Sequence, residues 1–228
     1  MTASPNTTAG SGGVAEETEV AIRDGSRIVV RPVRQADKEA IVAGFERLSP
    51  ESRYRRFFSP LERLSPADLR YLTEVDHHDH EALIGFSSDS REPVGVARFV
   101  RMDDPAFAEV AVTVIDDWQG RGVATALLAR LVARALEEGI THFVALVLSD
   151  NREVIDVFQH LAPQAVEPRR SASGHTELVI DITGPAERPI PAALGGALHA
   201  AARGALIANP WSVISRSIRR AREGARER

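Results

Sequence analysis

The chain has 228 residues and not one cysteine. This absence excludes disulfide bonds, thiolate nucleophiles and cysteine-ligated metal sites, and it fits a reducing compartment. No apolar run reaches the roughly 18–20 residues that a membrane-spanning helix needs. The N-terminus also lacks the basic segment followed by an apolar one that marks a secretory signal. Together these absences favour a cytoplasmic protein.

The sequence also lacks a large net charge, since its formal charge at pH 7 is −4. This value gives no reason to expect that the chain as a whole binds nucleic acid. Lys38 is the only lysine, a bias that we attribute to a GC-rich genome rather than to function. Hydrophobic residues make up 43%, so a core can form, and the length suffices for one domain with appendages.

Composition divides the chain into three parts. Residues 1–18 have almost no large apolar side chains and predict a disordered N-terminal tail. Residues 19–184 alternate strand and helix patterns, as a folded domain does. Residues 185–228 begin with a proline-rich linker and then become rich in alanine and arginine.

The C-terminal part is basic. Residues 185–228 carry eight arginines and three glutamates, a net charge of +5. Trp211, Ile214 and Ile218 share one helical face, so residues 204–228 are predicted to form a basic amphipathic helix. Such a helix can lie on an anionic membrane or an acidic partner protein. The alternative is that its short apolar face docks on its own domain.

Hydrophobic periodicity predicts the elements of the middle part. The expected strands are 27–33, 81–86, 93–101, 109–115, 141–148, 165–170 and 175–182. The expected helices are 36–48, 50–58, 66–73, 124–138 and 152–161. This order of elements predicts an α/β protein. Its sheet is expected to contain both parallel and antiparallel strands, as in α+β folds, with helices packed on it.

The most informative segment runs from Asp117 to Thr125, with the sequence Asp-Trp-Gln-Gly-Arg-Gly-Val-Ala-Thr. It lies between a predicted strand and a predicted helix. Glycines let the backbone approach a ligand closely and adopt torsions that other residues resist. The first helical turn then presents unpaired amides and the positive end of the helix dipole to an anion. The segment therefore predicts a pyrophosphate-binding loop, and an ordinary strand-to-helix turn is the alternative.

In this context the loop resembles motif A of the GCN5-related N-acetyltransferases (GNAT), which holds the diphosphate of coenzyme A. The order of elements over residues 30–184 is similar to the GNAT fold. Segments 48–58 and 75–84 look like the acetyltransferase domain of bacterial Pat-type protein lysine acetyltransferases, which acetylate acyl-CoA synthetases. The resemblance implies a GNAT fold with a C-terminal helical appendage. It also implies acetyl-CoA as co-substrate, and a protein acceptor such as an acyl-CoA synthetase. The chain is too short for the regulatory domain that these relatives often carry.

Acetyl transfer to lysine requires a base, because the ammonium group has a reference pKa of about 10.4 and cannot attack while protonated. Glu109 is the only charged residue of the predicted strand 109–115, whose other residues are valine, alanine, threonine and isoleucine, and the strand ends just before the loop. Its position matches the catalytic glutamate of Pat-type enzymes, so the resemblance implies that Glu109 is the general base. The alternative is a strand residue that faces solvent.

The resemblance also implies the residues that contact acetyl-CoA. They are Val112, Val114, Ile115, Gln119, Gly120, Arg121, Gly122, Val123, Ala124, Thr125 and Asn151. In the family the strand backbone pairs with the pantetheine arm as an extra strand would. Helix capping explains Asn151 equally well. Phe158 occupies the position of a tyrosine that often protonates the leaving thiolate, but a thiol pKa near 8.5 requires little help.

The histidine-rich segment 76–80 contains His77, His78 and His80 with Asp76 and Asp79. Its spacing fits no defined zinc pattern, so we expect no metal site. We expect an acetyl-CoA-dependent N-acetyltransferase that acts on a protein lysine by direct attack. The alternatives are an acetyltransferase for a small-molecule amine and a non-catalytic acetyl-CoA sensor.

Overall fold

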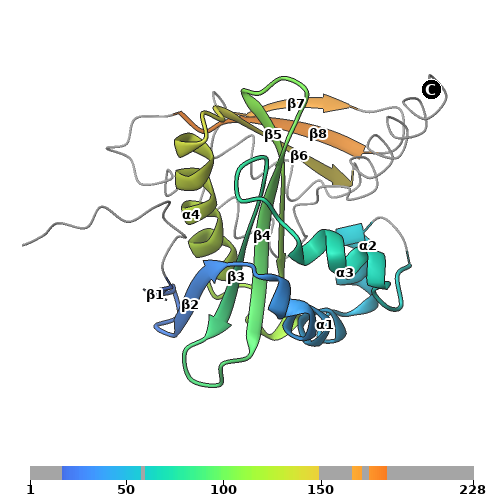
Figure 1. The fold of residues 1–228 in the computed structure, drawn as a ribbon, viewed down its shortest axis with the longest axis vertical. Coiled ribbons are helices and arrows are strands. Elements are labelled where there is room, and N and C mark those ends of the chain that lie inside the picture. Colours follow the sequence, from blue (N-terminus) through green and yellow to red (C-terminus); the bar gives the residue numbers. More distant parts are fainter. Residues whose placement is uncertain (1–16, 58–59, 149–165, 171–174, 184–228) are drawn as a thin grey trace, which may run out of the picture.

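The computed structural model describes residues 17–57, 60–148, 166–170 and 175–183, and these form a single layered body (Figure 1). At its centre is an eight-stranded sheet with the strand order β1-β2-β3-β4-β5-β6-β8-β7. The strands are β1 (Thr18–Ala21), β2 (Arg27–Pro32), β3 (His80–Ser87), β4 (Pro93–Arg101), β5 (Phe107–Val114), β6 (His142–Leu148), β7 (Val166–Arg170) and β8 (His175–Asp181). Every neighbouring pair is antiparallel except β5 and β6, which are parallel.

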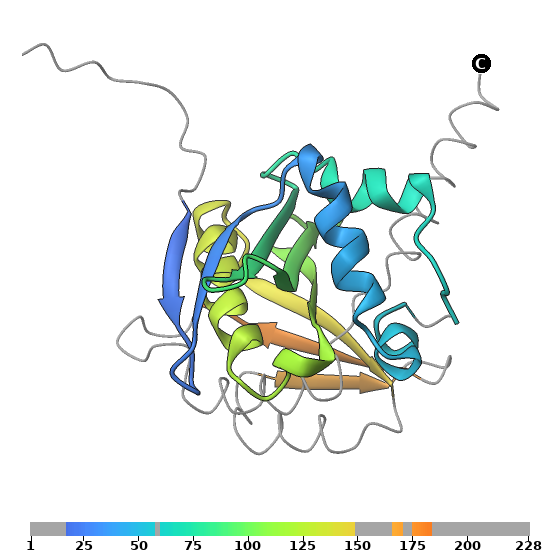
Figure 2. The ribbon, with the colours of Figure 1, turned by 90° about the horizontal axis from the view of Figure 1, so that it is seen from below.

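Helices cover both faces of the sheet (Figures 1 and 2). One face carries α1 (Lys38–Glu46), α2 (Pro50–Phe57) and α3 (Pro66–Thr73), and the other carries α4 (Val123–Glu137). A short 3-10 turn, η1 (Gln35–Asp37), precedes α1. A second one, η2 (Asp116–Trp118), lies between β5 and α4. None of the helices in the described part of the chain has the length and apolar character needed to cross a membrane.

Local sequence sets where the helices begin and end. Ser65 starts α3 with a capping box, because its hydroxyl accepts the Asp68 N–H while the Asp68 carboxylate accepts the Ser65 N–H. Pro66 follows at a first-turn position, where its missing N–H costs nothing. Helix α4 ends at its C-cap residue Glu138, and Gly139 follows with φ +76°, the left-handed conformation that commonly terminates a helix.

The apolar core divides along the two faces of the sheet. The larger cluster lies under α4, where Leu127 and Leu131 pack without solvent exposure against Phe99 of β4 and Val110 of β5. Burying each such side chain contributes about 1.5–3 kcal/mol. Under the other helices, two smaller clusters form, one around Ile84 and one of Phe45, Leu48, Phe57 and Ile115. The smaller clusters leave room for a pocket, which is described below.

The structure adds one strand that the sequence patterns did not predict. Strand β1 begins at Thr18, the last residue that we assigned to the N-terminal tail, and pairs with β2 through Thr18 and Val30. It has only four residues and lies at the edge of the sheet, so it is too short for a clear alternating pattern. The predicted helix 152–161, the loop 171–174 and the C-terminal appendage 185–228 lie outside the described residues.

Strands β5 and β6 pair over only part of their length. The register joins Phe107 to His142, Ala108 to Phe143 and Glu109 to Val144, and no further pair is formed in the described ladder. Strand β5 nevertheless continues to Val114, on the side that leads to residues 117–125, called the glycine loop below. The two parallel strands therefore part at Glu109, and no described strand pairs with the β5 backbone beyond it on that side.

Candidate active site

Glu109 lies at the point where β5 and β6 part, and its side chain is buried, with 4% of the residue exposed. It pairs with Val100 of β4, two residues from the Arg98–Ala111 pair. Because the side-chain period in a strand is two, Glu109 shares the sheet face of Arg98, which α1, α2 and α3 cover. The alternative that Glu109 faces solvent is therefore wrong.

Two groups from the covering helices lie near the Glu109 carboxylate. Arg56 of α2 is 4% exposed, and burial lowers its pKa to about 10, while the charges of Tyr71 and Glu109 act in the opposite direction. Burial also raises the pKa of the Tyr71 phenol of α3, so that phenol is neutral at physiological pH. The carboxylate thus lies in a water-poor environment beside a permanent cation.

Arg98 and His80 form the next contact on this sheet face. The guanidinium of Arg98 donates to Nε2 of His80 at 3.1 Å and to the carbonyl of Leu72 at 3.0 Å. Arginine has no acceptor atom, so Nε2 of His80 must be unprotonated. Burial and the Arg98 charge lower the His80 pKa to about 3. His80 is therefore neutral at physiological pH and does not serve as a proton carrier there.

The three histidines of segment 76–80 point to different partners. His77 contacts the carboxylate of Glu81 through Nδ1 at 2.8 Å, His78 contacts Glu138, and His80 contacts Arg98. In the described ranges no three His, Asp or Glu side chains converge in a way that could hold a metal ion. The segment is better explained as a connection that ties β3 to the end of α4.

The glycine loop has the backbone geometry that the sequence predicted. Gly120 has φ +74° and Gly122, the residue before α4, has φ +103°, a region that residues with a Cβ resist. The first helical hydrogen bond runs from the Ala126 N–H to the Gly122 carbonyl, so the N–H groups of Val123 and Ala124 find no acceptor within the helix. A concavity of about 170 Å³ lies over these residues and also touches Val114, Trp118, Gln119 and Thr125. This arrangement fits a diphosphate, because it offers backbone donors and no negative charge.

Gln119 and Arg121 of the loop have side chains that are engaged within the protein. Gln119 donates to the carbonyl of Val114 at 3.1 Å and so ties the loop to the end of β5. Arg121 pairs with Asp24 and lies 3.9 Å above the ring of Trp118. Both side chains therefore hold the loop in shape, and their backbone atoms remain the candidates for ligand contact.

Sequence reasoning missed the partner of this loop. The β1–β2 turn brings Arg23 to the carbonyl of Gly120 and Asp24 to Arg121. A Cβ built on Gly122 would lie 2.9 Å from the backbone nitrogen of Arg23. No pattern in the sequence could have indicated this contact, because the turn and the loop are about 97 residues apart.

The remaining predicted cofactor contacts are on β5 or outside the described part. Val112 and Val114 are buried in the cluster beneath α4, and Ile115 is buried in the cluster of Phe45, Leu48 and Phe57. Their side chains therefore belong to the core, and only their backbone can contact a ligand that lies beside β5. Asn151 and Phe158 lie outside the described residues.

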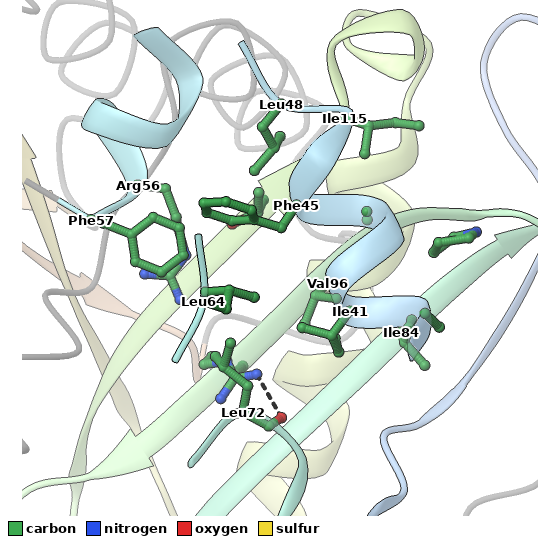
Figure 3. Close-up of a pocket in the computed structure, with 16 residues that line it drawn as sticks. Ile41, Phe45, Leu48, Arg56, Phe57, Leu64, Leu72, Ile84, Val96 and Ile115 are labelled. Carbon is green, nitrogen blue, oxygen red and sulfur yellow. Dashed lines mark hydrogen bonds between the residues drawn. The ribbon is translucent and has the colours of Figure 1, made fainter. Parts of the chain in front are cut away.

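A pocket that the sequence did not indicate lies between the helices α1–α3 and the strands β3–β5 (Figure 3). It has a volume of about 560 Å³, including the open space at its mouth. The rings of Phe45 and Phe57 lie edge to face in its wall, 5.7 Å apart, and Arg56 lies 5.0 Å from the ring of Phe57. Arg98 also lines the pocket, and Figure 3 marks its hydrogen bond to Leu72.

Known proteins share both the sequence and the fold. The family model of the acetyltransferase (GNAT) family matches residues 45–162. Acetyltransferase Pat of Mycolicibacterium smegmatis is 39% identical over 141 residues, which are 60% of this chain and 42% of that protein. Acetyltransferase PA5475 of Pseudomonas aeruginosa is 30% identical over 136 residues, which are 59% of this chain and 73% of that protein.

Solved structures agree with these relatives. The GNAT domain of S. lividans PAT has a TM-score of 0.65 and 37% sequence identity, covering 72% of this chain and 96% of that domain. The cAMP-binding acyltransferase from Mycobacterium smegmatis has a TM-score of 0.52 and 29% identity, covering 83% of this chain and 54% of that one. The chain thus spans less than half of the Pat protein that it matches and nearly all of an isolated GNAT domain.

These matches confirm the predicted mixed-sheet fold and the likeness to Pat-type enzymes. Acetyl-CoA-dependent N-acetyl transfer is the expected activity of that class. Because the family model covers more than half of the sequence, the chain belongs to the acetyltransferase (GNAT) family.

Proposed function

We propose that the protein transfers the acetyl group of acetyl-CoA to lysine side chains of another protein. The observation that carries this proposal is the position of two features on one strand. Glu109 is buried where β5 and β6 part, and the glycine loop follows the other end of β5. The six residues from Glu109 to Val114 span about 17 Å in extended conformation. An extended cofactor arm along β5 would join the loop to the carboxylate.

In this proposal the loop holds the cofactor and the β5 backbone aligns it. The N–H groups of Val123 and Ala124 and the positive end of α4 bind the diphosphate. The edge of β5 beyond Glu109 that faces away from β4 accepts the pantetheine arm in the manner of an added strand. Gln119 and Arg121 act indirectly, by holding the loop against β5 and the β1–β2 turn.

Glu109 would then take a proton from the acceptor ammonium, directly or through one water. The neutral amine attacks the thioester carbonyl and the C–S bond breaks. The second proton of the nitrogen then neutralises the departing thiolate, whose reference pKa of about 8.5 makes it a tolerable leaving group. Positioned proton transfer contributes about 10²–10⁴ to the rate. His80 does not compete for this role, because a pKa of about 3 makes its imidazole a weak base and its Nε2 accepts a hydrogen bond from Arg98.

The choice of a protein lysine as acceptor is supported by the likeness to Pat acetyltransferases. Helix α2 gives limited further support. Arg53 is held within the protein, because it donates to the carbonyls of Glu46 and Glu62, and Arg56 is buried. Tyr54 is 47% exposed on this helix, so an acceptor protein can reach its ring.

The proposal is tested by incubating the purified protein with acetyl-CoA and an acyl-CoA synthetase, followed by mass spectrometry of the synthetase. We expect site-selective lysine acetylation that requires the enzyme and is lost with Glu109→Gln. A comparison of lysine acetylation in cells with and without the gene identifies the acceptor. Acetylation of small amines without any protein acetylation would overturn the choice of acceptor and keep the acetyl transfer.

A further inference from the structure

Two arginines from distant parts of the chain meet at the glycine loop. Arg121 belongs to the loop, and Arg23 lies in the turn between β1 and β2. The guanidinium of Arg23 donates to the carbonyl of Gly120, and its backbone packs against Gly122. Both glycines line the concavity over the start of α4. Two cationic side chains therefore lie beside the proposed diphosphate site.

Arg121 is engaged by partners on three sides. Its Nε donates to the carboxylate of Asp24, a second nitrogen donates to the Ser26 hydroxyl at 2.6 Å, and the guanidinium lies 3.9 Å from the ring centre of Trp118. The hydrogen bond from Arg121 is the main cause that lowers the Asp24 pKa, so this carboxylate is ionised at neutral pH. Asp24 therefore neutralises the charge of Arg121, and little of that charge is available to a ligand.

Arg23 has the opposite surroundings. It is exposed, and the carbonyl of Gly120 is the one hydrogen-bond partner that it has among the described residues. No carboxylate in the described ranges forms an ion pair with it. A guanidinium carries several N–H donors in a rigid fork that matches the oxygens of a phosphate group. Arg23 thus offers a ligand both an uncompensated charge and free N–H groups.

The turn holds Arg23 in this place before any ligand arrives. On one side, Ile22 is buried in the core beneath α4, and its N–H donates to the Ser26 carbonyl at 2.8 Å. On the other side, Asp24 accepts the Ser26 N–H at 2.9 Å and is paired with Arg121. Because both neighbours are fixed, little backbone freedom is lost when the Arg23 side chain binds a ligand.

We propose that Arg23 binds a phosphate group of acetyl-CoA, and that it, rather than Arg121, supplies the cationic side chain of this site. The inference rests on the proposed binding of acetyl-CoA by the glycine loop. The N–H groups at the start of α4 carry partial charges, whereas the diphosphate and the 3′-phosphate of the cofactor carry full ones. Charge-assisted hydrogen bonds from Arg23 compensate them and favour coenzyme A over thioesters without phosphate.

The first test is calorimetric titration of acetyl-CoA into the full chain at pH 7 and low salt. Arg23→Gln keeps an N–H donor for the Gly120 carbonyl but removes the charge, so acetyl-CoA should bind about tenfold more weakly. Arg23→Lys keeps the charge and should stay within about threefold of the unchanged protein. Unchanged affinity in Arg23→Gln, or an equal loss in both variants, would overturn the proposal.

Arg27→Gln is the matched control. Arg27 is an exposed arginine of the same hairpin, but its guanidinium pairs with Glu19 at 2.8 Å and not with the glycine loop. Its replacement should leave acetyl-CoA affinity within about twofold, and added salt should narrow the gap between Arg23→Gln and the unchanged protein. Equal weakening by Arg27→Gln and Arg23→Gln would show a general effect of net charge and would overturn the contact.

A ligand series identifies the phosphate group. If the loss in Arg23→Gln disappears with 3′-dephospho-acetyl-CoA, Arg23 binds the 3′-phosphate, and if the loss persists, Arg23 binds the diphosphate. S-acetylpantetheine has no phosphate, so Arg23→Gln and the unchanged protein should respond to it alike. A loss with S-acetylpantetheine as large as that with acetyl-CoA would show that Arg23 only maintains the shape of the loop, and would overturn the proposal.

These titrations contain no acceptor, so they separate this inference from the proposed function. Acetyl-CoA binding that depends on Arg23, without acetylation of any protein, would count against the choice of acceptor alone. Protein acetylation with equal acetyl-CoA affinity in Arg23→Gln and the unchanged protein would count against the role of Arg23 alone.

Discussion

Gly122 lies so close to Arg23 that a Cβ on the glycine would come within 2.9 Å of the Arg23 backbone nitrogen. The β1–β2 turn therefore packs on the glycine loop at the point where α4 begins. Two features require glycine at this position of the loop. Its φ of +103° disfavours a residue with a Cβ, and the contact with Arg23 leaves no space for one.

The first prediction concerns this contact. Gly122→Ala should displace the loop from the β1–β2 turn and lower acetyl-CoA affinity at least tenfold. Gly122→Asp should lower it further, because a carboxylate would face the diphosphate. Calorimetric titration of acetyl-CoA into each variant measures the effect.

Gly139→Ala is the matched control. Gly139 also has a positive φ, +76°, but a Cβ there meets nothing within 4 Å, and it lies at the opposite end of α4. This variant should lose about 1 kcal/mol of stability from backbone strain and bind acetyl-CoA normally. If Gly122→Ala bound acetyl-CoA as Gly139→Ala does, the loop would not be the cofactor site.

The second prediction concerns the base. Glu109→Gln keeps the size of the side chain but cannot accept a proton, so kcat should fall about 10²–10⁴-fold while acetyl-CoA affinity is retained. Steady-state kinetics from pH 6 to pH 9 with saturating acetyl-CoA measure the loss. Unchanged turnover across that range would move the role to another residue.

Glu81→Gln is the matched control, because it changes another buried glutamate of the sheet in the same way. Glu81 is 1% exposed on β3, but its carboxylate contacts His77 and Arg134 on the face that α4 covers. Its replacement should lower the free energy of unfolding and leave kcat within about twofold. A loss of activity equal to that of Glu109→Gln would show that disturbance of the sheet, rather than loss of the base, reduces turnover.

The third prediction follows from the bidentate ion pair between Arg31 and Asp37. Arg31 donates to both carboxylate oxygens of Asp37 at 2.7 Å, and the Arg34 N–H donates to the same group. Burial alone would raise the Asp37 pKa, but these hydrogen bonds outweigh it and keep the pKa below 3.8. The pair therefore stabilises the fold above pH 4, and its contribution is lost as the pH falls through the lowered pKa.

Asp37→Asn should cost about 3 kcal/mol in urea unfolding at pH 7 and much less near pH 2. The exposed Lys38–Glu74 pair beside it serves as the control, since Glu74→Gln should leave the midpoint nearly unchanged. Equal destabilisation by Asp37→Asn at both pH values would show that the carboxylate charge is not what stabilises this turn.

The fourth prediction concerns the basic C-terminal segment. Ile182 is buried, and its N–H donates to the Thr141 carbonyl at 3.0 Å, so the domain needs the chain at least to this residue. Truncation after Ile182 should leave a folded protein that still binds acetyl-CoA and acetylates. Co-sedimentation of both forms with anionic vesicles, at low and physiological salt, tests whether residues 204–228 bind an acidic surface.

Loss of acetyl-CoA binding on truncation would show that the segment belongs to the catalytic domain. Equal vesicle binding by both forms would show that residues 204–228 do not serve to bind a membrane.

Local sequence was sufficient to predict helix α4 and the glycine loop before it. Apolar spacing located α4, whose buried stripe includes Leu127 and Leu131, and glycines at Gly120 and Gly122 marked the positive φ values between strand and helix. These features depend on neighbours within a few residues, so their physical causes are present in the local sequence.

The alternating sequence pattern along β5 left open whether the Glu109 side chain is buried, and the fold answers that question. The sequence placed Glu109 in a strand but could not tell a buried side chain from an exposed one, because that depends on whether helices cover its face of the sheet. Helices α1–α3 do cover it, and they bring Arg56 and Tyr71 near Glu109 from separate elements.

The short strand β1, the contact of Arg23 with the loop and the pocket at Arg98 likewise arise only from the fold. The loop contact and the pocket join residues that are far apart in the chain, so a single sequence carries no local signal for them, whereas β1 is too short for a clear alternating pattern. Burial then gives these contacts their chemistry, since the low-dielectric interior sets the pKa of His80 and leaves the Arg98 donor without a partner among the described residues.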